Sequence, residues 1–203
     1  MSQNSLFHKN PQPERIKIRN GELLFIPSFL NLQNATKYYD ALEKNIEWKQ
    51  EQLKIYGKVI NFPRLTAWYG DSESIYSYSG LTFHPHPWTK ELIKLKNLIE
   101  PIGKTKFNSV LLNLYRSGSD SMSWHTDAEK ELGLNPVIAS LNLGEERVFQ
   151  LRHNLTKEKI NIPLINGSLL IMQGELQHHW QHQIPKTKKL KGKRINLTFR
   201  LIK

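Results

Sequence analysis

Apolar residues in the first half of the chain recur every three or four positions. One series lies between residues 32 and 46 and a second between residues 92 and 102: Leu32, Ala35, Tyr39, Leu42 and Ile46, then Leu92, Leu95, Ile99 and Ile102. This spacing gathers the apolar side chains on one face of an α-helix. Thr89 stands just before the second series, where its hydroxyl can cap the first turn. We therefore predict two amphipathic helices.

From about residue 107 the apolar pattern changes to that of short β-strands. Apolar or alternating segments are separated by turn residues and lie at 107–115, 137–143, 147–152, 158–162, 167–173 and 194–202. Shorter segments of the same kind lie at 21–25, 65–69 and 75–78. Many short strands divided by turn residues are typical of a β-sandwich or a β-barrel. The pattern thus predicts a mainly β protein with flanking helices, in the α+β class.

The length of 203 residues and the hydrophobic content of 38% fit a single globular domain. Residues 1–20 are polar and contain two prolines, so we predict a flexible N-terminal tail followed by one domain over 21–203. The chain has no cysteine, which excludes disulfides and thiolate metal sites. It shows no signal peptide and no apolar run of membrane length, so we expect a soluble intracellular protein without membrane contact.

The chain is strongly basic, with a formal net charge of +11 and a pI near 9.7. Such an excess of positive charge suggests a polyanionic partner such as nucleic acid, although charge alone equally allows a merely soluble basic protein. Five lysines lie in the stretch 186–193. We predict that this lysine loop contacts phosphates, with a solvent-exposed run of charge as the alternative.

The sequence His125-Thr126-Asp127 places two kinds of metal ligand two residues apart. Side chains two apart share a face of a β-strand, so the imidazole and the carboxylate can converge on one ion. Taken alone, such a pair is more often a buried hydrogen-bonded pair. One histidine from a later group would complete the two-histidine, one-carboxylate triad of non-haem Fe(II) oxygenases. That group follows the predicted strand 167–173 and comprises His178, His179 and His182.

Two arginines lie on the polar face of the last predicted strand. Polar and apolar residues alternate from residue 194 onward, and the polar face carries Arg194, Asn196, Thr198 and Arg200. Positive charges inside a barrel are costly unless they are paired. Because the planar guanidinium fits a carboxylate, the pattern indicates a bound carboxylate near the metal.

Together these motifs resemble the AlkB family of Fe(II)/2-oxoglutarate-dependent dioxygenases, which remove alkyl groups from nucleic-acid bases. The likeness is nearest to the human homologues acting on DNA and RNA and to their bacterial relatives. It implies a double-stranded β-helix, or jelly roll, over 107–203, braced by the N-terminal helices, and a nucleotide-recognition lid at about 50–85. The stretches that carry the resemblance are 63–70, 107–127, 136–144 and 182–200.

The resemblance also assigns roles to the candidate residues. It selects His182 as the third metal ligand, beside His125 and Asp127, and implies Fe(II), O2 and 2-oxoglutarate as cofactor and co-substrates. The distal carboxylate of 2-oxoglutarate would lie on Arg194, and the metal-proximal carboxylate near Arg200. The full set of implied 2-oxoglutarate contacts is Asn113, Tyr115, Arg194, Asn196 and Arg200.

The substrate contacts that the resemblance implies are Tyr56, Arg64, Tyr76, Tyr78 and Glu129. Tyr76 and Tyr78 match aromatic residues of the family's base pocket, and Arg64 is a candidate contact to phosphate or to the lid. Tyr56 aligns with an aromatic wedge of a duplex-active relative, with an ordinary hairpin tyrosine as the alternative. Close relatives carry an acidic residue that contacts the target base where this chain has Ala128, which leaves the lesion preference open.

The implied function is oxidative demethylation of N-alkylated bases such as 1-methyladenine and 3-methylcytosine, a direct-reversal DNA repair that releases formaldehyde. Alkylated DNA is the expected partner, RNA is a further candidate, and the sequence does not rank single strands against duplexes. We expect a monomer in the cytoplasm of a bacterium or, for a eukaryotic protein, in the nucleus. Two alternatives remain: the same chemistry on a protein or small-molecule substrate, and a non-catalytic nucleic-acid binder.

Overall fold

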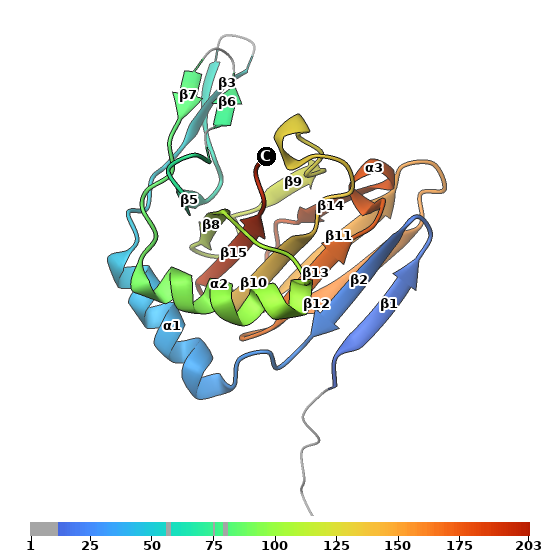
Figure 1. Ribbon diagram of the computed structural model, residues 1–203, viewed down its shortest axis with the longest axis horizontal. Coiled ribbons are helices and arrows are strands. Elements are labelled where there is room, and N and C mark those ends of the chain that lie inside the picture. The colour runs from blue at the N-terminus through green and yellow to red at the C-terminus, as the bar shows by residue number, and fades with distance from the viewer. Residues whose placement is uncertain (1–11, 56–57, 75, 79–80) are drawn as a thin grey trace, which may run out of the picture.

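Two antiparallel β-sheets form the centre of the molecule (Figure 1). The computed structural model describes residues 12–203 except 56–57, 75 and 79–80. The larger sheet has seven strands, in the spatial order β1 (Glu14–Ile18), β2 (Gly21–Ile26), β13 (Leu169–Gln173), β10 (Ile138–Gly144), β15 (Arg194–Arg200), β8 (Ser109–Tyr115) and β5 (Leu65–Gly70). The smaller sheet has the order β12 (Lys159–Leu164), β11 (Arg147–His153), β14 (Trp180–Ile184) and β9 (Met122–His125).

Apolar side chains from the two sheets meet in a core between them. Tyr115 and Leu170 of the larger sheet belong to the same buried cluster as Phe149, Leu151 and Trp180 of the smaller sheet. The alternation along each strand produces this arrangement, because every second side chain points to the same face. The arrangement is the jelly roll that the resemblance implies, with the candidate site at one side of this core.

Two helices cover the outer face of the larger sheet, α1 (Leu32–Asn45) and α2 (Lys90–Gly103). The predicted cap of the second helix is confirmed, since Thr89 Oγ1 accepts the N–H of Leu92 at 3.3 Å. Of the predicted stripes, Leu42 and Leu92 are buried, but Leu32 is 74% exposed. Leu32 is the first residue of α1 and lies before the turn that contacts the sheet.

The stretch expected to form a lid contains two separate hairpins. One pairs β3 (Gln52–Ile55) with β4 (Lys58–Asn61), and the other pairs β6 (Tyr76–Tyr78) with β7 (Leu81–Phe83). Both project from the same end of the molecule beyond β5 (Figure 1). Neither hairpin shares a ladder with the two main sheets among the residues that the structure describes.

The expected boundaries of the tail and of the jelly-roll core are corrected by three early strands. Residues 14–18, inside the predicted tail, form β1 and pair with β2 in full register. The strand was missed because most of its side chains are exposed and polar; its apolar residues, Ile16 and Ile18, contact the inter-sheet core only partly. With β1, β2 and β5 in the larger sheet, the jelly roll draws on residues well before 107.

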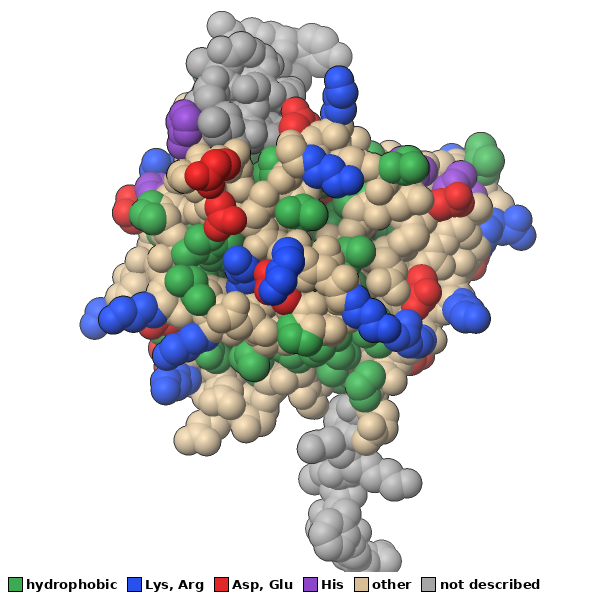
Figure 2. All heavy atoms as spheres, viewed as in Figure 1, with side chains coloured by type: hydrophobic (Ala, Val, Ile, Leu, Met, Phe, Trp, Pro, Cys, Tyr) green, Lys and Arg blue, Asp and Glu red, His purple; other side chains and the backbone are tan. Residues whose placement is uncertain are grey.

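The surface carries its charge in scattered groups. On the face drawn in Figure 2, Lys and Arg side chains lie around the periphery and across the middle, with Asp and Glu side chains between them. No helix in the described part of the chain is long and apolar enough to span a membrane.

Candidate metal and co-substrate site

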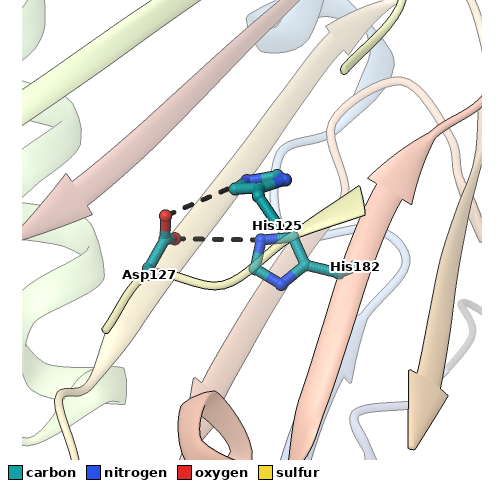
Figure 3. A group of neighbouring side chains, drawn as sticks. All are labelled: His125, Asp127 and His182. Atoms are coloured by element: carbon teal, nitrogen blue, oxygen red, sulfur yellow. Dashed lines mark ion pairs between the residues drawn. The ribbon is translucent and has the colours of Figure 1, made fainter. Parts of the chain in front are cut away.

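Three potential metal ligands come together at the edge of the smaller sheet. His125 ends β9, His182 lies in β14, and the two residues are paired across the ladder. Asp127 follows β9 by two residues, and its carboxylate faces both imidazoles (Figure 3). The Nε2 atoms of His125 and His182 lie 3.9 Å from Asp127 Oδ1 and Oδ2, respectively. The predicted convergence is therefore present, although Asp127 reaches it from a loop and not from a strand face.

The spacing of these atoms suits a shared cation better than direct hydrogen bonds. A distance of 3.9 Å is too long for a hydrogen bond between nitrogen and oxygen. One ligand atom from each residue can be chosen so that all three lie within 4.8 Å of one another. No other group of His, Asp and Glu among the described residues meets that condition.

The protonation states at the cluster are those that bind a metal. His125 Nδ1 lies 2.8 Å from the carbonyl oxygen of Ser123, which only accepts, so Nδ1 carries a proton and Nε2 is the nitrogen that remains to bind a metal. Burial, and then the neighbouring His125, lower the pKa of His182 to about 3. Burial raises the pKa of Asp127, but the charges of Arg200 and the histidines outweigh it and bring that pKa to about 2. Neutral imidazole and ionised carboxylate are the metal-binding forms.

Arg194 is a buried cation with no carboxylate partner in the described part of the chain. Its side chain is 1% exposed, and one Nη donates to Asn142 Oδ1 at 2.6 Å. Its guanidinium lies over the ring of Tyr115, 4.9 Å from the ring centroid. The Nε and the other Nη have no hydrogen-bond partner among the described residues. Burial lowers the pKa of Arg194 to about 10, so the group stays charged at neutral pH and two of its donors remain available to an anion.

One cavity connects the metal-ligand cluster with Arg194. All five residues expected to bind the co-substrate line it: Asn113, Tyr115, Arg194, Asn196 and Arg200. Arg200 donates to Asp127 Oδ1 at 2.8 Å, which ties the far end of β15 to the cluster. Asn196 differs from the expectation, because its amide donates to Ser140 Oγ at 2.8 Å and to the Leu141 carbonyl at 3.2 Å. Asn196 therefore holds β10 and β15 together at the cavity wall.

Arg64 is placed differently from one of its two expected roles. The side chain was a candidate contact to phosphate or to the lid, and its exposure of only 5% argues against the phosphate contact. Its Nε donates to Asn113 Oδ1 at 2.6 Å, and its guanidinium lies 5.0 Å from the ring centroid of Phe62. Arg64 is buried because β5 pairs directly with β8, which carries Asn113. Its contact with Asn113 leaves the amide nitrogen of Asn113 for another partner in the cavity.

The other expected substrate contacts are only partly described. Tyr56 lies outside the described residues, and so do the side chains of Tyr76 and Tyr78, whose backbone forms β6. Glu129 is half-buried, and its Oε2 is buried without a hydrogen-bond partner among the described residues. Burial, and then the charge of Asp127, raise the pKa of Glu129. Ala128, which stands where close relatives carry an acid, is exposed.

The alternative third ligands and the lysine loop are placed more clearly. His178 and His179 end the short helix α3 (Leu176–His179), and His179 Nε2 lies 3.5 Å from Glu175 Oε2. Neither histidine belongs to the cluster, which supports the choice of His182.

In the lysine loop, two lysines have acidic partners: Lys191 pairs with Glu145 at 2.7 Å and Lys193 with Glu43 at 2.8 Å.

Sequence reasoning missed two residues that shape the site. Asn142 is 1% exposed and orients Arg194, and Gln177 of α3 is 2% exposed and contacts the loop that carries Asp127. The first was detectable, because Asn142 is an amide residue within a predicted strand, 137–143, that is otherwise apolar except for Ser140. Gln177 gave no signal, since the polar stretch 175–179 resembles a surface turn.

Comparison with known proteins agrees with the family that the sequence motifs resemble. A family model described as the 2OG-Fe(II) oxygenase superfamily matches residues 22–200. The "Alpha-ketoglutarate-dependent dioxygenase alkB homolog 3" of Bos taurus is 42% identical over 186 residues, covering 87% of this chain and 64% of the relative. The human protein of the same name is 41% identical with the same coverage. The chain thus spans about 64% of the length of these relatives.

A second group of relatives is matched over more of its length. The human "DNA oxidative demethylase ALKBH2" is 36% identical over 179 residues, covering 83% of this chain and 69% of the relative. Among solved structures, that of OsALKBH1 aligns with a TM-score of 0.64 at 16% identity, covering 93% of this chain and 100% of the other. A prolyl hydroxylase from Trichoplax adhaerens aligns with a TM-score of 0.59 at 16% identity, covering 89% and 84%. These two structures show a shared fold.

Proposed function

Because the chain belongs to the 2OG-Fe(II) oxygenase superfamily and, within it, to the AlkB family of dioxygenases, we propose that it removes alkyl groups oxidatively from nucleic-acid bases. Members of this superfamily use Fe(II), 2-oxoglutarate and O2. The observation that carries the proposal is one cavity that joins a His-Asp-His cluster to a buried arginine without a carboxylate partner among the described residues. The cluster suits a metal, and the arginine suits an anionic co-substrate.

The donor set of the cluster fits Fe(II). Two imidazole nitrogens and one carboxylate are the ligands of the facial triad in non-haem iron oxygenases, which leaves positions for other ligands. His125 Nε2 and His182 Nε2 both face Asp127 at distances beyond hydrogen bonding, so their lone pairs are unused within the cluster. We assign His125, Asp127 and His182 as the iron ligands.

The arginines of β15 fit a dicarboxylate. An uncompensated buried charge is strongly destabilising, and a carboxylate on the two available donors of Arg194 would compensate it. We therefore assign the distal carboxylate of 2-oxoglutarate to Arg194, beside the ring of Tyr115. The other end of the co-substrate would lie toward the cluster, where Arg200 lines the same cavity.

The contribution of this chain to the reaction is binding and orientation. When bound, iron and O2 supply the oxidising chemistry, in which 2-oxoglutarate loses CO2 to give succinate and the N-alkyl carbon gains a hydroxyl group, so that it leaves as formaldehyde. Arg200 holds Asp127 through Oδ1 and so keeps the carboxylate turned toward the imidazoles. Apolar residues such as Leu111, Phe149 and Ile184 line the cavity and limit the access of water to it.

We propose N-alkylated bases of the 1-methyladenine and 3-methylcytosine type as substrates, in DNA and, as a second substrate, in RNA. The names of the relatives support this choice, since one group is called a DNA oxidative demethylase. The net charge of +11 supports a polyanionic partner. A base must leave the stack to reach a buried cluster of this kind, and bases in single strands do so at lower cost than paired bases.

The decisive experiment supplies the Fe(II)-loaded protein with 2-oxoglutarate, O2 and an oligonucleotide that contains 1-methyladenine, and measures succinate and formaldehyde. We expect both products from the wild type and neither from Asp127→Ala, because the iron loses its only carboxylate ligand. His179→Ala is the matched control and should remain active, since His179 lies outside the cluster. Activity of Asp127→Ala would refute the metal site, whereas succinate without formaldehyde would assign the chemistry to another substrate.

A further inference from the structure

Gln177 connects the short helix α3 to the loop that carries Asp127. The N–H of Asp127 donates to Gln177 Oε1 at 2.9 Å, and Thr126 Oγ1 donates to the Gln177 carbonyl at 2.9 Å. Asp127 lies beyond the end of β9, so its N–H is not part of the strand's ladder. A buried N–H needs an acceptor, and here a side chain fifty residues away supplies it.

The orientation of the Gln177 amide follows from its neighbours. A backbone N–H only donates, so the amide oxygen must face Asp127 and the amide nitrogen must point away from it. The nitrogen lies 3.8 Å from Met172 Sδ, which is a weak acceptor. The side chain is 2% exposed, so water does not compete with either contact. The hydrogen bond to Asp127 is therefore defined in direction as well as in length.

Helix α3 is itself attached to two other parts of the fold. The N–H of Asn154, in the turn after β11, donates to the His179 carbonyl at 2.7 Å, and Asn154 Nδ2 donates to the His178 carbonyl at 3.2 Å. Trp180, which follows α3, donates its Nε1 to the Arg19 carbonyl in the β1–β2 turn at 2.7 Å. Gln177 thus projects from a helix whose C-terminal end is held by hydrogen bonds to two other parts of the chain.

We propose that Gln177 is a positioning residue for the metal site. It acts through Asp127: by fixing the backbone of that residue, it holds the carboxylate opposite both imidazoles before a metal binds. Partners that orient metal ligands in this way commonly change metal affinity about 10–100-fold when they are removed. The inference rests on the proposed function only in taking His125, Asp127 and His182 as the metal ligands.

The test is a titration of the metal-free protein with Mn(II), in which the electron paramagnetic resonance signal of free Mn(II) reports how much of the ion remains unbound. Gln177→Met keeps the length and volume of the side chain but replaces the amide oxygen by a thioether, which is at most a weak acceptor, and should weaken Mn(II) binding about 10–100-fold. Gln177→Asn keeps the amide but is one methylene too short, and should weaken binding in the same direction. His178→Ala is the control on the same helix; its side chain is exposed, and its affinity should stay within about twofold of the wild type.

The outcomes separate positioning from packing. A purely structural role would lower the melting temperature of the metal-free Gln177→Met protein and leave its Mn(II) affinity unchanged. Mn(II) affinities of both Gln177 variants within twofold of the wild type would overturn the inference. A wild-type protein that binds Mn(II) but, when loaded with Fe(II) and supplied with 2-oxoglutarate and O2, leaves methylated oligonucleotides intact would refute the proposed substrate and not the role of Gln177. Mn(II) binding that survives Asp127→Ala would overturn both.

Discussion

Replacing Arg194 with methionine is expected to separate co-substrate affinity from protein stability. The side chain is 1% exposed and has no carboxylate partner among the described residues, so the folded protein bears the cost of burying its charge. Methionine occupies a similar volume without charge. The variant should therefore bind 2-oxoglutarate more weakly while its ligand-free form is at least as stable as the wild type.

The expected magnitudes follow from the contacts of Arg194. Its pKa falls from 12.5 to about 10, chiefly because of burial. Since one pKa unit corresponds to about 1.4 kcal/mol, the folded surroundings together disfavour the charged side chain by roughly 3 kcal/mol. The variant loses this cost at neutral pH. One charge-assisted hydrogen bond to a carboxylate contributes about 1.5–3 kcal/mol, so 2-oxoglutarate should bind roughly 10- to 150-fold more weakly.

The two quantities are measured separately. Calorimetric titration of 2-oxoglutarate into Mn(II)-loaded protein, without O2, gives the affinity, and urea unfolding of the ligand-free protein gives the stability. Arg15→Met is a matched control, because Arg15 is an exposed arginine paired with Glu22 at 2.6 Å and should change neither quantity by much. A 2-oxoglutarate affinity within threefold of the wild type would refute the assignment. A loss of oligonucleotide affinity instead would place this face of β15 on the nucleic acid.

Two further predictions concern charged side chains outside the candidate site. Replacing the three lysines of 186–189 by glutamine should make the plot of log oligonucleotide affinity against log salt concentration less steep, by about 0.7–0.9 per lost phosphate contact. Lys191→Gln is the control and should change the slope less, because Lys191 pairs with Glu145. An unchanged slope would leave the lysine loop as a solvent-exposed run of charge. Burial raises the pKa of Glu100, but hydrogen bonds from Lys106 and the Phe107 N–H outweigh it and hold that pKa below 4.5. Glu100→Gln should therefore destabilise the protein by roughly 1 kcal/mol at pH 7. This difference should shrink as the pH falls below about 4.5, because a lowered carboxyl pKa stabilises the fold fully above the unfolded pKa and progressively less as the pH falls through the folded pKa. Urea unfolding at pH 7 and 3.5 that gives equal differences would contradict it.

Much of the fold could be predicted from the sequence because helices and strands each give apolar residues a characteristic local spacing. The helix beginning after Thr89 and the strand 194–200 were predicted from apolar spacing and alternation, and both are present. β9 and β14 were missed because each is short and mixes polar with apolar residues; their position follows from pairing with β11 and with each other. Such pairing joins residues far apart in the chain, and no local pattern records it.

The site likewise contains some residues that the sequence indicated and others that it did not. The His-x-Asp motif and the arginines of β15 became candidates through their residue types and spacing, and the resemblance to the family then assigned their roles. The burial of Arg64 against Asn113 was not predictable, because a basic residue in a predicted strand looks the same whether it faces solvent or a neighbouring strand. Gln177 was hidden for the opposite reason, as its polar surroundings in the sequence gave no sign of burial.

The order of strands in the larger sheet has a consequence for how the protein folds. β15 lies between β8 and β10, and β2 pairs with β13, so Leu24 stands opposite Ile171. Pairing segments that are so distant along the chain carries an entropic cost of loop closure, and this cost makes folding slow. Both arginines of the cavity lie on β15, which follows the other described strands along the chain. A chain whose β9 and β14 have already brought His125 and His182 together therefore has neither cation in place until β15 pairs with β8 and β10, so the pocket for 2-oxoglutarate depends on that central pairing.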